Sequence, residues 1–180
     1  MLSKLGFKLL HERFPKLTYG SPIVKVDFRN FEHDSRVNLV RVVLERKGRA
    51  IRWYPERRIR IEGFKSKESQ DSLPEGLIPD AIFLSSKNLR VAVEVELSVR
   101  KRSRFKTKIE EYNRVMNYSS NPLIHKVLFI VGLDSLRRDL TEIIGTKKNF
   151  LLEDFSHFAE SLYPKENLQD LNGEEEDGGE

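Results

Sequence analysis

The amino-acid sequence predicts an α/β domain with a central mixed sheet flanked by helices. Two neighbouring apolar runs, 78–84 and 89–97, have the length and composition of buried strands. A third run, 126–132, is apolar almost throughout, which is typical of a strand buried on both faces. Because helical patterns precede and follow these strands, the order favours a sheet placed between helices.

The first part of the chain carries weaker patterns. Before the two predicted strands at 78–84 and 89–97, the expected elements are, in order, a helix over 2–14, an extended segment over 22–28, a helix from Asp34 or Ser35 to about Lys47 ended by Gly48, strand-like segments at 50–54 and 58–61, and a polar loop over 63–76.

Helical spacing is strongest after the two predicted strands at 78–84 and 89–97. Apolar residues recur at helical intervals from Phe105 to Met116, through Ile109 and Tyr112, and predict a helix over 101–117. The remaining elements expected are a turn at 85–88, a helix over 135–144 and a late element over 150–162.

The length of 180 residues suits one principal domain. We expect an N-terminal appendage over 1–30, the α/β domain over 31–164 and a disordered acidic tail over 165–180. The chain has no cysteine, no membrane-spanning apolar run and no recognisable secretion signal, so a cytoplasmic protein with no membrane partner is expected. The four histidines lack the spacing of zinc ligands, and nucleotide-binding glycine motifs are missing.

Basic residues cluster strongly. The chain has a net charge of +4, but the last seven residues contain five acids, which leaves 32 Lys and Arg against 23 Asp and Glu, or +9, for the rest. Such density suits a phosphate backbone and predicts salt-sensitive binding to DNA. The open alternatives are a solvated surface and a face that meets an acidic protein. The residues expected to contact nucleic acid are Arg57, Arg58, Arg100, Lys101, Arg102, Arg104 and Lys106.

Carboxylates occupy positions in the two predicted strands where apolar residues are easier to bury. Glu94 and Glu96 point to the same face of their strand because side chains alternate, and Asp80 lies on the neighbouring strand. Burying such acids is costly unless a cation or donors offset it. Asp80, Glu94 and the backbone carbonyl of Val95 therefore form a candidate site for Mg²⁺ or Mn²⁺. Salt bridges on an exposed sheet face are the structural alternative.

Lys108 is the candidate activating cation. It follows Phe105 by three residues and precedes Tyr112 by four, at the edge of the apolar face of its helix, so its ammonium can reach back toward the sheet. A cation there would steady an attacking water or the charged phosphate. Taken singly, Lys108 suits a solvated helix position, and Tyr112 suits the core.

These residues resemble the PD-(D/E)xK nuclease superfamily, and most of all its replication-relaxation group from plasmids and mobile elements. The resemblance spans roughly 31–132 and is carried by Pro79-Asp80, Glu94-Val95-Glu96, Lys108 with Tyr112, and the segment 32–38. It implies a restriction-endonuclease-like core in which Asp80 and Glu94 hold metal, Glu96 assists and Lys108 activates. It also suggests Glu45 and Tyr112 as additional site residues, and a winged-helix remnant over 17–29.

The resemblance leaves two functions open. One is a metal-dependent DNA endonuclease that processes mobile-element or plasmid DNA. The other is a non-catalytic DNA-binding or assembly factor on the same fold, because Glu96 occupies the position of the usual catalytic lysine. DNA preference, the role of the acidic tail, and whether the chain forms a homodimer or joins other proteins of a mobile-element machinery stay open.

Overall fold

The computed structural model describes residues 28–64, 72–74, 76–98, 101–118 and 120–162, together with residue 12. The chain groups into two units, Met1–Asp34 and Ser35–Glu180, and the sheet belongs to the second. The described elements are α2 (Phe28–Arg46), β1 (Ala50–Pro55), α3 (Glu56–Glu62), β2 (Ala81–Ser85), β3 (Arg90–Glu96), α4 (Arg102–Asn117), β4 (Lys126–Val131), α5 (Asp134–Ile144), β5 (Phe150–Asp154) and α6 (Phe155–Leu162).

Several expected segments fall outside the described residues. The helix over 2–14, the extended segment over 22–28 and the winged-helix remnant lie almost wholly outside them, and the acidic tail does so completely. The domain boundaries after residues 30 and 164 therefore stay predictions. Among the helices of the described ranges, none is both long and apolar enough to cross a membrane.

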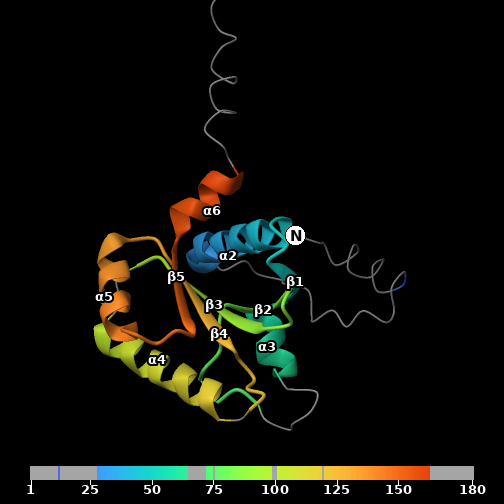
Figure 1. Cartoon of the computed structure of the whole chain (residues 1–180). Coiled ribbons are helices and arrows are strands. Elements are labelled where there is room, and N and C mark those ends of the chain that lie inside the picture. The colour runs from blue at the N-terminus through green and yellow to red at the C-terminus, as the bar shows by residue number, and fades with distance from the viewer. Residues whose placement is uncertain are drawn as a thin grey trace, which may run out of the picture. The chain divides into compact units, whose positions relative to one another are not determined.

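The strands of the described residues form one mixed sheet in the order β1-β2-β3-β4-β5 (Figure 1). β1, β2 and β3 pair antiparallel, whereas β3, β4 and β5 pair parallel. The antiparallel and parallel halves therefore meet at β3, the strand that carries Glu94 and Glu96. This arrangement confirms the predicted α/β class with a central mixed sheet flanked by helices.

Helices cover both faces of this sheet (Figure 1). One face packs against α3, α4 and α5 and includes Ala92 of β3. The other face packs against α2 and α6 and includes Val91, Val93 and Val95 of the same strand. The strand's side-chain period of two thus separates two apolar clusters, one on each side of the sheet.

Helix α4 follows the predicted apolar stripe. Phe105, Ile109, Tyr112 and Met116 are all buried against the sheet, as the helical spacing predicts. The helix begins one residue later than expected and ends at the predicted residue. Its orientation is therefore fixed by apolar packing, and this packing decides where its polar residues point.

Helix α2 begins earlier than predicted. It starts at Phe28, so Asp34, Ser35 and the resemblance's segment 32–38 lie inside the helix instead of at its start. A capping residue inside a helix costs only a few tenths of a kcal/mol, which does not force a boundary. The end at Gly48 is as predicted: Gly48 has a positive φ of 64°, and backbone bonds from Gly48 to Glu45 and from Arg49 to Leu44 close the helix.

The strand-like segment predicted at 58–61 is wrong, since these residues belong to helix α3. Two isoleucines two residues apart suggested a strand, but in a helix they lie on nearly opposite sides, and Ile59 is buried while Ile61 is 64% exposed. Ion pairs four residues apart support the helix, between Arg58 and Glu62 at 2.8 Å and between Arg60 and Glu56.

Strand β2 begins three residues later than predicted. It starts at Ala81, so Pro79 and Asp80 precede it. Pro79 has no N–H to donate to a sheet ladder, which favours a start beyond it. At the other end, Asn88 adopts a positive φ of 59° in the turn to β3, and its N–H donates to Ser85. The late start of β2 shapes the site described next.

Candidate active site

Asp80 lies where the antiparallel ladder between β2 and β3 ends. Ala81 pairs with Val93, so the backbone of Val95 extends beyond the first residue of β2. The N–H of Val95 donates instead to Oδ2 of Asp80 at 2.7 Å. Since the N–H and C=O of a strand residue point to the same side, the Val95 carbonyl faces the side on which Asp80 lies. The structure thus brings two of the predicted metal ligands, Asp80 and the Val95 carbonyl, together just before the start of β2.

Glu94 is buried beneath α4, with 1% of its surface exposed. Lys108 donates from Nζ to Oε2 of Glu94 at 2.6 Å, and the hydroxyl of Tyr112 donates to Oε1. Lys108 and Tyr112 are four residues apart, one turn of α4, so both reach the same carboxylate. The helix therefore supplies a donor to each oxygen of Glu94.

Glu96 lies on the same face and is 5% exposed. Its Oε1 is 3.6 Å from Nζ of Lys108, so the lysine stands between two carboxylates. The alternative of salt bridges on an exposed sheet face does not hold for Glu94 and Glu96, because both are buried. They do form ion pairs, with a lysine that is itself 24% exposed.

Burial and charge shift the pKa values of Glu94, Tyr112 and Lys108. Burial raises the pKa of Glu94 to about 7; the nearby charge of Asp80 adds to this, while Lys108 and the Tyr112 hydrogen bond oppose it. Burial raises the pKa of Tyr112 well above 10, and Glu94 raises it further. For Lys108, burial is the largest effect and lowers the pKa, but Glu94, Glu96 and Asp80 outweigh it and the net shift is upward. Near pH 7, Lys108 is an ammonium and Tyr112 a neutral donor.

The donor atoms of Asp80, Glu94 and the Val95 carbonyl suit a hard divalent cation. Two carboxylates and a carbonyl supply oxygen only, and Mg²⁺ commonly takes one or two carboxylates with water and substrate phosphates completing its shell. Within the described ranges, no group of three or more His, Asp or Glu side chains is placed to hold a metal by itself. Asp80, Glu94 and the Val95 carbonyl could therefore supply only part of the shell of such an ion.

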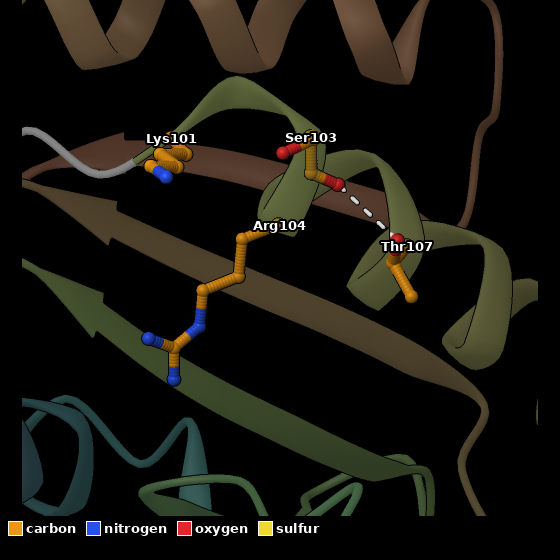
Figure 2. A pocket seen from close by; sticks show the side chains of 4 residues that line it. All are labelled: Lys101, Ser103, Arg104 and Thr107. Atoms are coloured by element: carbon orange, nitrogen blue, oxygen red, sulfur yellow. Dashed lines mark hydrogen bonds between the residues drawn. The ribbon is translucent and has the colours of Figure 1, made fainter.

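Basic and hydroxyl side chains surround the start of α4. Lys101, Ser103, Arg104 and Thr107 line an open hollow of about 410 Å³. The hydroxyl of Thr107 donates to the backbone oxygen of Ser103 at 3.2 Å. Figure 2 shows this bond as a dashed line and shows Arg104 extending away from both residues. The two hydroxyl residues were not predicted. The sequence feature that could have indicated them is their position within the basic run 100–108.

The other residues predicted to contact nucleic acid differ in their ion pairs and exposure. Arg102 pairs with Glu142 at 2.6 Å and lies 3.6 Å from Asp139, so it ties α4 to α5. Arg58 pairs with Glu62 and lies over the ring of Tyr54. Lys106 and Arg57 are exposed, and Arg100 falls outside the described residues.

Glu45 is not brought to the cluster. It lies on α2, whose apolar residues Val40 and Leu44 pack on the face opposite Glu94, and it accepts a hydrogen bond from Arg41 at 2.9 Å. Trp53 of β1 is buried and stacks on Phe83 with ring centres 6.2 Å apart. Core packing therefore accounts for this tryptophan.

Comparison of the chain with protein-family models, with curated proteins and with solved structures gives no match.

Proposed function

We propose that this protein binds DNA and hydrolyses its phosphodiester bonds with Mg²⁺ or Mn²⁺. The observation that carries the proposal is the buried Glu94, which accepts hydrogen bonds from Lys108 and Tyr112. It follows Val93 on β3 and precedes Val95, whose backbone N–H donates to Asp80. Buried acids with shifted pKa values, grouped with a lysine, are typical of catalytic sites. The resemblance to PD-(D/E)xK nucleases, a prediction from the sequence, agrees with it.

Each residue has a distinct role in this proposal. Asp80, Glu94 and the Val95 carbonyl would hold the ion, which would supply a water of lowered pKa and positive charge near the phosphate. Lys108 keeps its ammonium at neutral pH and stabilises the negative charge that develops on the phosphate. Tyr112 holds the orientation of Glu94 through its hydroxyl. Glu96 assists by its charge beside Lys108.

The substrate follows from the basic residues. Arg104 lies one turn before Lys108 on α4, and Lys101 directly precedes this helix. Both line an open hollow with two hydroxyl residues. Cations and hydroxyls of this kind contact phosphate oxygens without reading base sequence. We therefore propose DNA as the substrate, with binding that weakens as salt rises. That this DNA belongs to plasmids or mobile elements is what the resemblance implies.

A second candidate is a non-catalytic DNA-binding or assembly factor. One observation favours it: Lys108 and Tyr112 already donate to both oxygens of Glu94, so this carboxylate has its hydrogen bonds without an ion. In this case the basic residues alone would carry the function.

Cleavage assays separate the two candidates. Wild type, Asp80→Ala and Asp80→Asn are incubated with supercoiled, linear and single-stranded DNA, with Mg²⁺, Mn²⁺ or EDTA. Asp80→Asn is the matched variant because its side-chain oxygen can still accept from Val95. We expect metal-dependent cutting by wild type and a loss of at least about 100-fold in both variants, as for removal of a principal catalytic group. Salt-sensitive binding by all three without any cutting would establish the non-catalytic candidate.

A further inference from the structure

Lys108 occupies the place that a cation at Glu94 would need. Its ammonium lies 2.6 Å from Oε2 of Glu94, while Tyr112 donates to the other oxygen. Two positive charges a few ångströms apart repel strongly in a partly buried site. A divalent ion that binds Glu94 therefore requires the ammonium to move away from it.

A second carboxylate lies within reach of the same ammonium. Oε1 of Glu96 is 3.6 Å from Nζ of Lys108, and Glu96 shares the strand face of Glu94. The lysine stem is flexible, and the Lys108 side chain keeps 24% of its surface exposed. A small movement about the stem exchanges Glu94 for Glu96 without leaving the charge unpaired.

We propose that Glu96 is a positioning residue that receives Lys108 when a divalent ion binds Asp80 and Glu94. This inference rests on the metal site of the proposed function and assigns Glu96 a role other than metal ligand. It also explains why an acid suits a position where the resemblance leads one to expect a lysine. The pair Glu96 and Lys108 would set the affinity for the ion without touching it.

A double-mutant cycle on the full chain tests this coupling. Mn²⁺ binding is measured by titration calorimetry, with no DNA present, for wild type, Lys108→Met, Glu96→Gln and the double variant. We expect Lys108→Met to tighten Mn²⁺ binding about tenfold, because the competing ammonium is gone. We expect Glu96→Gln to weaken binding about tenfold in wild type but only about twofold in the Lys108→Met background.

Matched controls remove the same charges elsewhere. Lys87 and Glu110 are exposed, on the turn before β3 and on the outer side of α4. Lys87→Met and Glu110→Gln should change Mn²⁺ affinity by less than about twofold, as expected for charges screened by solvent. If thermal melting shows that Lys108→Met does not fold, Lys108→Gln takes its place in the cycle.

The outcomes are separable. An equal loss from Glu96→Gln in both backgrounds would make Glu96 itself a ligand and overturn the proposal. Unchanged affinity in Lys108→Met would also overturn it, because the ammonium would then not compete. Absence of Mn²⁺ binding by every protein, wild type included, would remove the metal site of the proposed function and this inference with it.

Discussion

The two faces of β3 differ sharply although one strand makes both. Val91, Val93 and Val95 form a wholly apolar row against α2 and α6. The opposite row places Ala92 in the core and then Glu94 and Glu96 under α4. Both rows are buried, so burial alone does not distinguish the structural face from the candidate active face.

The difference lies in what the covering helices offer. Helix α2 meets its face with apolar residues such as Val40 and Leu44, whereas α4 brings a lysine and a tyrosine hydroxyl to the carboxylate of Glu94. A buried acid persists only where donors and cations offset its lost hydration. The face under α4 therefore gives up apolar packing for a charged cluster, as functional sites commonly do.

The largest expected effect comes from moving the acid to the wrong face. Val93 is fully buried on the apolar side, and Val93→Glu would place a carboxylate where the described neighbours are apolar. We expect a loss of more than about 4 kcal/mol, enough to unfold a typical domain. Urea denaturation followed by circular dichroism measures it, with Val93→Ala, at about 1–3 kcal/mol, as the control for lost volume. A native urea midpoint for Val93→Glu would show that the two faces are equivalent.

Stability should depend on pH through Glu94. Its pKa is raised to about 7 in the folded chain from an ordinary 4.5, so the folded state binds the proton more tightly than the unfolded state. Its contribution is fully present below about pH 4.5 and is lost as pH rises through about 7, a change of about 3 kcal/mol.

Glu94→Gln tests this dependence. The amide cannot titrate, so the fall in stability between pH 5 and pH 8 should become shallower than in wild type. Urea midpoints at each pH provide the measurement, and the exposed Glu110→Gln is the control. Parallel pH profiles for Glu94→Gln and wild type would show that Glu94 has no raised pKa.

A smaller effect is expected at Tyr112. Tyr112→Phe removes the hydroxyl that donates to Glu94 while keeping the buried ring, so stability should fall by about 1 kcal/mol. Because this hydrogen bond lowers the pKa of Glu94, its loss should move the pH dependence to higher pH. The same urea series measures both effects. A pH profile identical to wild type would argue against contact between Tyr112 and Glu94.

The sequence predicted the core well where one pattern dominated. The stripe from Phe105 to Met116 and the apolar run of β4 are buried as expected, because no competing signal overlaps them. Helix α3 was missed because Ile59 and Ile61 mimic strand alternation, and the ion pairs that favour a helix are visible only when spacing four is considered. The start of α2 was missed because capping residues are tolerated inside helices.

The candidate site was predicted only in part. Alternation placed Glu94 and Glu96 on one face, and helix spacing placed Lys108 near the sheet. Two features were not deducible: the donation of Tyr112 to Glu94 and the hydrogen bond between Asp80 and Val95. Both depend on where β2 begins relative to β3 and on how α4 lies over β3. Local sequence does not specify such offsets between elements.

The bond from Val95 to Asp80 also gives the protein a built-in reporter. A backbone amide proton that donates to a carboxylate has a chemical shift that depends on the charge and position of that carboxylate. The Val95 resonance in an ¹⁵N correlation spectrum would therefore move when an ion binds Asp80. The Val95 nitrogen, 2.7 Å from Oδ2 of Asp80, would record binding of an ion in an ¹⁵N-enriched sample without substrate, an attached probe or a substitution.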